Sequence, residues 1–208
     1  MEGIFITFEG IEGCGKSTQA ELLMKYLQSE GFDVVLSREP GGTPIAERIR
    51  DVLLDNTHKE MLAKTEILLY SASRSQHTGE KLIPALKKGK IVISDRYYDS
   101  TLAYQGAARQ LDSNAVKFLC SFASSDLVPD ITFLIDVPAE VGLSRINVEK
   151  ADRLEQEALE FHQRVRQGFL DLANKHKRIV IINGQNSIEK INGLIMEIVK
   201  KKIKERRK

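Results

Sequence analysis

Residues 10–18 read Gly10-Ile11-Glu12-Gly13-Cys14-Gly15-Lys16-Ser17-Thr18, and the first eight match the pattern G-x-x-x-x-G-K-[ST] in full. An apolar run precedes this segment, and a stretch with apolar residues at helical spacing follows it. In such a loop the glycines let the backbone curl so that successive N–H groups face a phosphate, and the next helix N-terminus adds partial positive charge. We therefore expect residues 10–18 to bind ATP, with Lys16 on the β- and γ-phosphates and the Ser17 hydroxyl on Mg²⁺.

Short apolar runs alternate with helical stretches along the chain, a pattern typical of an α/β protein with a parallel sheet. Five runs lack a clean polar alternation, as expected of strands covered on both faces: Ile4–Phe8, Asp33–Leu36, Ile91–Ser94, Ile131–Asp136 and Ile179–Ile182. The helical pattern covers Thr18–Glu30, Pro44–Leu54, Lys64–Lys88 with a kink or end at Pro84, Asp112–Ser124 and Asp152–Lys175. Ligands bind beyond the carboxyl ends of parallel strands, so the loops after the five runs are expected to share one rim.

The length of 208 residues, with 42% hydrophobic and 29% charged residues, fits one globular domain over residues 1–208. No long uninterrupted apolar window and no basic signal-peptide region occur, so we expect no membrane partner. The two cysteines, Cys14 and Cys120, lack metal-ligand spacing and favour a reducing cytoplasm. The basic residues 200–208 follow an apolar helical stripe, which indicates a helix C-terminus rather than a nucleic-acid site.

The phosphate loop alone does not identify the group that receives the phosphate. A regulatory GTPase would carry an N-K-x-D motif, and Asn174-Lys175-His176-Lys177 lacks the aspartate. The D-x-x-G switch of such a protein and the signature loop of a transporter ATPase do not occur in the sequence either. Three segments favour a small phosphorylated acceptor instead: Arg38–Thr43, Tyr70–Arg74 and Asp95–Gly106.

Five motifs carry a family resemblance: Phe8-Glu9-Gly10, the Arg38–Thr43 loop, Asp95-Arg96-Tyr97, Tyr104-Gln105-Gly106 and Asp152-Arg153-Leu154-Glu155. In these motifs and their order, the sequence resembles the thymidylate kinase family over nearly the whole chain. The resemblance implies the P-loop nucleoside-monophosphate-kinase fold, with a five-stranded parallel sheet in the order 2-3-1-4-5, flanking helices and a mobile lid at about 142–155. It also implies transfer of the γ-phosphoryl of ATP to dTMP, giving dTDP and ADP in dTTP biosynthesis, by a homodimer.

The same resemblance implies how the nucleoside part of dTMP would be bound. Tyr70 would stack on the thymine ring, while Arg74 and Gln105 would form hydrogen bonds with its edge. Tyr104 would pack beside the deoxyribose, and Glu12 would contact the 3′-hydroxyl. Because Tyr70 follows three apolar residues, a position in the core is an equally good interpretation of the pattern alone.

The phosphates and the metal would be held by charged residues of the same segments. The resemblance implies that Arg38 and Arg96 hold the acceptor phosphate, that Arg50 supports them, and that Asp95 orders Mg²⁺ through water. Glu39, Ser100 and Thr101 complete the candidate acceptor site. The candidate catalytic residues are Lys16, Arg96, Arg153 and Glu12.

The sequence offers several candidates for a catalytic cation in the lid. Some family members carry an arginine in the phosphate loop where this chain has Gly13, and its absence resembles the bacterial type with a lid arginine. The expected lid offers Arg145, Lys150 and Arg153, and Arg153 is favoured because it lies in the Asp-Arg-x-Glu motif. Such a cation would neutralise charge that develops during phosphoryl transfer.

Several residues have competing interpretations. Asp136 could be an acid near Mg²⁺, but a helix N-cap before Pro138 is favoured. The four histidines show no metal or triad spacing and receive no chemical role: His58, His77, His162 and His176. A nucleoside-monophosphate kinase for another base and a non-catalytic nucleotide-binding protein remain the alternative functions.

Overall fold

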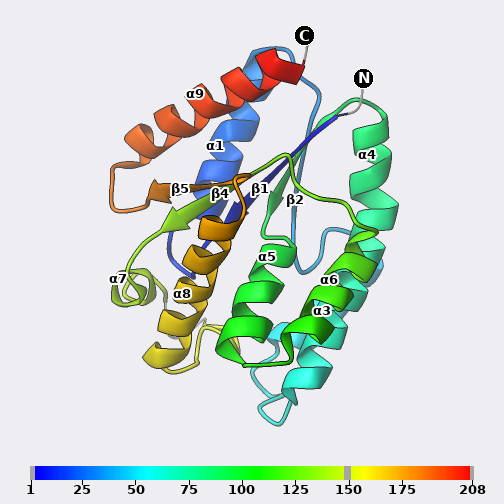
Figure 1. Ribbon diagram of the computed structural model, residues 1–208, viewed down its shortest axis with the longest axis vertical. Helices are drawn as coiled ribbons and strands as arrows, with labels where there is room; N and C mark the ends of the chain where they lie inside the picture. The colour runs from blue at the N-terminus through cyan, green and yellow to red at the C-terminus, as the bar shows by residue number, and fades with distance from the viewer. Residues whose placement is uncertain (1–2, 148–150, 207–208) are drawn as a thin grey trace.

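The computed structural model describes residues 3–147 and 151–206. Five parallel strands form one sheet in the order β2-β3-β1-β4-β5 (Figure 1). The strands are β1 (Ile4–Glu9), β2 (Val34–Arg38), β3 (Ile91–Asp95), β4 (Ile131–Asp136) and β5 (Ile179–Asn183). The predicted fold class and strand order are therefore confirmed.

Four strands extend beyond the predicted apolar runs at their carboxyl ends. The ladder continues through polar residues, because Asp95 at the end of β3 pairs with Phe8 on one side and with Arg38 on the other. Strand β2 also begins at Val34, one residue later than predicted. Hydropathy cannot mark these ends, since ladder hydrogen bonds need backbone groups and not apolar side chains. As a result, charged side chains stand directly at the rim where ligands are expected.

The helical elements follow the strands in α/β fashion. They are α1 (Lys16–Ser29), α2 (Pro44–Leu54), α3 (Ala63–His77), the π-helical turn η1 (Thr78–Leu82), α4 (Ile83–Lys87), α5 (Tyr98–Thr101), the π-helical turn η2 (Leu102–Ala108), α6 (Ser113–Ser124), α7 (Ala139–Leu143), α8 (Leu159–Lys175) and α9 (Ile188–Arg206). Pro84 does not end the predicted long helix. The π-helical turn before Pro84 changes the hydrogen-bond register, and the helical backbone continues to Lys87.

Helix α8 begins at Leu159 and not at the predicted Asp152. The Asp152 carboxylate accepts the backbone N–H groups of Leu154 (2.9 Å) and Glu155 (3.0 Å), which closes a turn. Asp112 has a related capping role, accepting from the backbone of Asn114 and Ala115 at the start of α6.

Two layers of helices cover the sheet. Helices α1 and α9 pack against each other on one face, while α8 packs against η2 on the other (Figure 1). The three central strands β1, β3 and β4 are almost entirely buried, in agreement with their continuous apolar pattern. In the described part of the chain, no helix has the length and apolar character to cross a bilayer.

Candidate active site

The phosphate loop connects β1 to α1 and lies under α7. Gly13 has a φ of 66°, and a Cβ atom at this position would come within 2.0 Å of the Gly142 carbonyl oxygen in α7. A Cβ on Gly142 would in turn lie 2.5 Å from the Glu12 carbonyl oxygen. Only two facing glycines allow this approach. The contact places the start of the expected lid directly on the loop.

Two polar side chains of the loop form hydrogen bonds within the site. The Lys16 ammonium donates to the Ile11 carbonyl oxygen at 3.2 Å, inside the curl of the loop. The Ser17 hydroxyl donates to Oδ2 of Asp95 at the end of β3. Oδ1 of Asp95 is buried and has no hydrogen-bond partner among the described residues. An unsatisfied carboxylate oxygen beside a hydroxyl is a fitting environment for a hydrated Mg²⁺.

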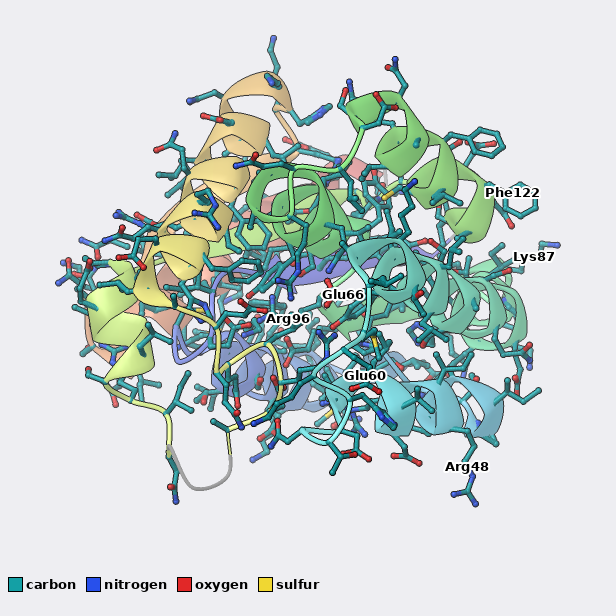
Figure 2. The ribbon with its side chains drawn as sticks, turned by 90° about the horizontal axis from the view of Figure 1, so that it is seen from below. Arg48, Glu60, Glu66, Lys87, Arg96 and Phe122 are labelled. Carbon is teal, nitrogen blue, oxygen red and sulfur yellow. The ribbon has the colours of Figure 1, made fainter. Side chains whose placement is uncertain are left out.

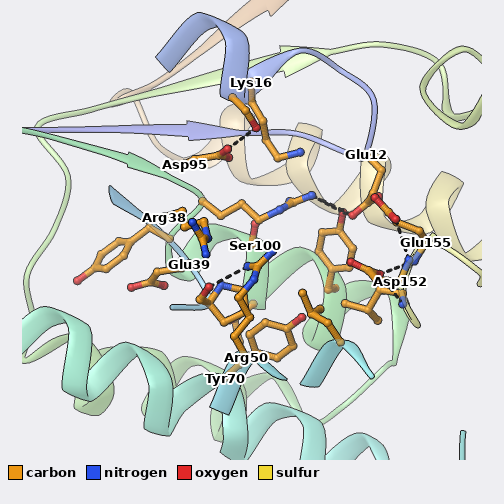
Figure 3. A pocket seen from close by; sticks show the side chains of 18 of the residues that line it. Glu12, Lys16, Arg38, Glu39, Arg50, Tyr70, Asp95, Ser100, Asp152 and Glu155 are labelled. Carbon is orange, nitrogen blue, oxygen red and sulfur yellow. Dashed lines mark hydrogen bonds and ion pairs between the residues drawn. The ribbon is translucent and has the colours of Figure 1, made fainter. Parts of the chain in front are cut away.

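A cavity of about 340 Å³ extends from this loop towards α3. Figure 3 shows Lys16 and Asp95 at one end of it, and Arg50 with Tyr70 at the other. Every residue predicted to bind the acceptor lines this cavity: Arg38, Glu39, Arg50, Tyr70, Arg74, Arg96, Ser100, Thr101, Tyr104 and Gln105. The ends of β2 and β3, the helices α2 and α3 and the turns that follow β3 thus bring together residues from separate segments of the sequence.

Arg96 links the phosphate loop to the acceptor cavity. Its Nη1 donates to the Gly10 carbonyl oxygen (2.9 Å) and to the Ser100 hydroxyl (3.0 Å). Its Nη2 donates to Oε1 of Glu12 (2.9 Å) and to the Tyr104 hydroxyl (3.2 Å). Burial alone lowers the pKa of Arg96, but Tyr104, Glu12 and other acidic groups around it raise that pKa well above its usual value. Arg96 is therefore a permanent cation at the junction.

Glu12 is a buried carboxylate that remains ionised. Its Oε1 accepts from Arg96 and from the Tyr104 hydroxyl, and its Oε2 lies 3.3 Å from Nδ1 of His162. Burial raises the pKa of Glu12, but Arg96, His162 and Lys16 together hold it well below its usual range. An ionised carboxylate only accepts hydrogen bonds, so this group can bind a sugar hydroxyl.

The far end of the cavity has the polarity of a base site. The Arg74 side chain is completely buried, and its Nε donates to Oε2 of Glu39 at 2.8 Å. Its Nη1 is also buried and has no hydrogen-bond partner among the described residues. Gln105 donates from Nε2 to Oε1 of Glu66 at 2.9 Å. Tyr70 both lines the cavity and packs against the core, so the two interpretations of its pattern are compatible.

Two more guanidinium groups face the acceptor side. Arg38 pairs with Glu47 at 2.9 Å, and its side chain is 55% exposed, so the group can reach a ligand. Arg50 donates to the Pro40 carbonyl oxygen at 2.8 Å, in the loop that contains the cis Glu39–Pro40 bond. Together with Arg96 they give the cavity a positive character suited to a phosphate.

A family model described as thymidylate kinase matches residues 8–195. The chain belongs to the thymidylate kinase family. It is 50% identical over 192 residues to a thymidylate kinase of Carboxydothermus hydrogenoformans, with 92% of this chain and 94% of that protein covered. It is 46% identical over 209 residues to a thymidylate kinase of a Nostoc species, with 99% of both chains covered. The crystal structure of thymidylate kinase from Ehrlichia chaffeensis matches with a TM-score of 0.79 and 36% identity, covering 96% of this chain and 99% of the other.

The predicted lid cation of this thymidylate kinase family member is engaged elsewhere. Nη2 of Arg153 forms an ion pair of 2.6 Å with Oε2 of Glu66, and its Nε donates to the Leu53 carbonyl oxygen at 3.1 Å. Among the described residues that line the cavity Arg153 does not occur, although its neighbours Asp152 and Leu154 do. A buried carboxylate is costly without a cationic partner, and Arg153 is one of the cations that pair with Glu66.

Of the two lid candidates that the structure describes, Arg145 contacts the phosphate loop, through a 3.2 Å hydrogen bond from Nη1 to the Gly13 carbonyl oxygen. Lys150 lies outside the described residues. A catalytic role for Arg153 stays a prediction, and it requires Arg153 to leave both Glu66 and Leu53.

Other interpretations of the sequence need correction. Asp136 does not cap a helix; both its oxygens accept from Arg166 of α8, at 2.7 and 2.9 Å. His77 and His162, which received no role, are completely buried beside functional carboxylates. Glu66 was missed as well. Nothing local marks these residues, because their partners lie far away in the sequence.

Proposed function

We propose that this member of the thymidylate kinase family transfers the γ-phosphoryl group of ATP to dTMP, forming dTDP and ADP for dTTP biosynthesis. The observation that carries the proposal is the single cavity that runs from the Lys16 loop to Arg74. It has a phosphate-binding loop at one end and a buried, unsatisfied donor at the other. Cationic side chains line the cavity between the two ends, where they can neutralise the charge of two phosphates during phosphoryl transfer.

Thymine fits the hydrogen-bonding groups at the base end. Nη1 of Arg74 needs an acceptor, which O4 of thymine supplies and the amino group of cytosine does not. Glu66 takes one amide proton from Gln105, so the Gln105 carbonyl oxygen can accept from N3–H of thymine. A buried donor left without a partner is costly, so this arrangement selects against a base that lacks the acceptor.

The sugar and the two phosphates occupy the rest of the proposed site. The Glu12 carboxylate accepts from the 3′-hydroxyl, beside the ring of Tyr104. Arg38, Arg50 and Arg96 bind the acceptor phosphate and reduce its repulsion from the donor. An oxygen of that phosphate then attacks the γ-phosphorus in line, with no covalent enzyme intermediate.

Mg²⁺ would be held by Ser17 and by the unsatisfied Oδ1 of Asp95, together with phosphate oxygens. When bound, it would neutralise charge on the β- and γ-phosphates. The described residues contain no cluster of three or more His, Cys, Asp or Glu that could hold a metal alone, so the nucleotide completes the site. We assign the lid cation to Arg145, since it already contacts the loop.

A second copy of the chain is the proposed partner. Apolar side chains lie exposed on three helices that pack side by side, α2, α3 and α6: Ile45, Val52, Leu68, Phe118 and Phe122. The rings of Phe118 and Phe122 stack on each other with 66% and 72% of each residue exposed, and Figure 2 shows Phe122 at the outer edge of the molecule. Exposed stacked aromatics favour an interface. Light scattering after chromatography should give a dimer mass, and the Phe122→Lys variant should give a monomer.

The reducing cytoplasm is the proposed compartment, because it suits the buried free thiols Cys14 and Cys120.

ADP release from ATP and Mg²⁺ tests the proposed reaction, with dTMP, dUMP, UMP, CMP and AMP supplied separately. We expect strong turnover with dTMP and none in the Lys16→Ala variant. A nucleotide-binding protein without transferase activity would release no ADP in response to any monophosphate. A preference for AMP or UMP would instead overturn the proposed base specificity.

A further inference from the structure

A chain of buried hydrogen bonds leads away from Arg74 to a residue that does not line the cavity. Oε2 of Glu39 binds Nε of Arg74 (2.8 Å), and Oε1 lies 3.0 Å from Nδ1 of His77. Nε2 of His77 lies 2.7 Å from the hydroxyl of Ser37 at the end of β2. All four residues are at least nine-tenths buried. The chain therefore joins β2, the following loop and α3 through side chains alone.

The hydrogen-bond inventory fixes the protons in this chain. An ionised Glu39 paired with Arg74 can only accept, so Nδ1 of His77 carries a proton and donates to it. In the neutral ring Nε2 is then an acceptor, and the Ser37 hydroxyl donates to it. One carboxylate and one guanidinium leave the cluster without net charge, which suits its burial. Glu39 thereby selects the Nδ1–H tautomer, and the Ser37 hydroxyl, which can donate or accept, supplies the partner of the second nitrogen.

The surroundings leave His77 little freedom. A Cβ atom on Gly42 would come within 2.6 Å of Nε2 of His77 and of the Ser37 hydroxyl. The loop backbone thus closes over the imidazole, and Gly42 is the residue that lets it do so. With both oxygens engaged, Glu39 cannot rotate, and Nε of Arg74 is held at a fixed point. The unpaired Nη1 of Arg74 is consequently held in place too.

We infer that His77, held between Glu39 and Ser37 by its two ring nitrogens, is a positioning residue for Arg74, and that it sets the preference of the cavity for a pyrimidine with oxygen rather than an amino group at C4. This inference rests on the proposed function, and it extends that function to residues that do not line the cavity. A long guanidinium arm discriminates between bases only when it is held still, because an arm free to move can turn away from a mismatched amino group.

Two substitutions of His77 separate the two nitrogens. In His77→Asn the amide nitrogen can take the place of Nδ1 and keep the donation to Glu39. In His77→Gln the amide reaches the place of Nε2, so the contact with Ser37 can persist while Glu39 loses its donor. The substrates dUMP and dCMP both lack the 5-methyl group and differ at C4 and in the hydrogen on N3. The N3 difference faces Gln105 in every variant, so a change in their ratio between variants reports on the group that faces C4.

We expect His77→Gln to raise KM for dTMP about 10-fold, the loss of one hydrogen bond to a charged group, with kcat and KM for ATP within about 2-fold of the original chain. The ratio of kcat/KM for dUMP to that for dCMP should fall about 10-fold. His77→Asn should restore most of both values. Ser37→Ala should change the same two quantities in the same direction, about 3-fold, because it removes the second hydrogen bond that holds the imidazole and leaves the donation to Glu39 in place.

Unchanged KM and an unchanged base ratio in His77→Gln, with only a lower melting temperature, would overturn the inference and leave His77 a packing residue. If His77→Gln does not fold, Ser37→Ala and His77→Asn provide the test. Equal changes of KM for dTMP and of the base ratio in these two variants, or no change in either variant, would also overturn the inference. If the original chain shows no turnover with dTMP, the proposed reaction has failed. Calorimetric titration with dTMP then still tests the positioning role, through weaker binding to His77→Gln than to His77→Asn.

Discussion

Removal of the Arg96 guanidinium should expose how strongly the site depends on one cation. In Arg96→Ala the carboxylate of Glu12 keeps its buried position but loses the partner at 2.9 Å. The two side chains are 16% and 9% exposed, so solvent screens the pair little. A buried charge left without its partner costs about 3–5 kcal/mol, and for a chain of this size this corresponds to a melting temperature about 10 °C lower.

The physical cause can be isolated with a second substitution. Glu12→Gln removes the unpaired charge, so the double variant Arg96→Ala/Glu12→Gln should be more stable than Arg96→Ala alone. The free energy of unfolding in urea is the measurement, at about pH 7, for the original chain, both single variants and the double variant. Arg96→Lys is the matched control, since it keeps the charge at the junction and should recover part of the stability.

The stability of Arg96→Ala should also depend on pH in a defined direction. In the original chain the pKa of Glu12 is depressed, so its stabilising contribution is present above the unfolded value and is lost only in strong acid. Without Arg96, burial dominates and raises the pKa of Glu12, so the deficit of Arg96→Ala should shrink as the pH falls towards about 5. Additive effects of the two substitutions, or a deficit independent of pH, would refute the reasoning.

Three further predictions concern neighbouring parts of the site. Burial and the charge of Asp99 raise the pKa of Glu9 to about 8, so between about pH 5 and 8 the folded chain keeps a proton on Glu9 that the unfolded chain has lost. The free energy of unfolding should therefore decline as the pH rises from about 5 to 8. Glu9→Gln should flatten that decline in thermal melts. Arg145→Ala should lower kcat about 100-fold or more at little cost in stability, whereas Arg153→Ala should chiefly lower the melting temperature, and the reverse order would return the lid role to Arg153. Gly13→Ala should abolish ATP binding measured by calorimetry, because its Cβ would meet the Gly142 carbonyl; unchanged affinity would show that α7 does not need this contact.

Local sequence predicted the parts of the fold whose physics is local. The loop at Gly10–Ser17 works through its own backbone, so its motif identifies it without knowledge of its neighbours. The buried strands β1, β3 and β4 were recognisable because a strand covered on both faces has to be apolar throughout. Their order came from the resemblance to a family and not from the pattern. The turn at Asp152 was missed, since a short hydrogen-bonded turn can share the composition of a helix start.

The sequence by itself predicted a phosphate loop at the end of a strand, and the family resemblance of its motifs predicted which segments line the cavity beside that loop. Only the tertiary structure decided where the charged side chains find their partners. Arg153 pairs with Glu66 and Asp136 with Arg166, and His77 supports Glu39, across intervals of many residues. The physical reason is that burying a charge is costly wherever it occurs, so each buried group takes the complementary partner that the fold brings within reach, and a linear pattern does not record that proximity.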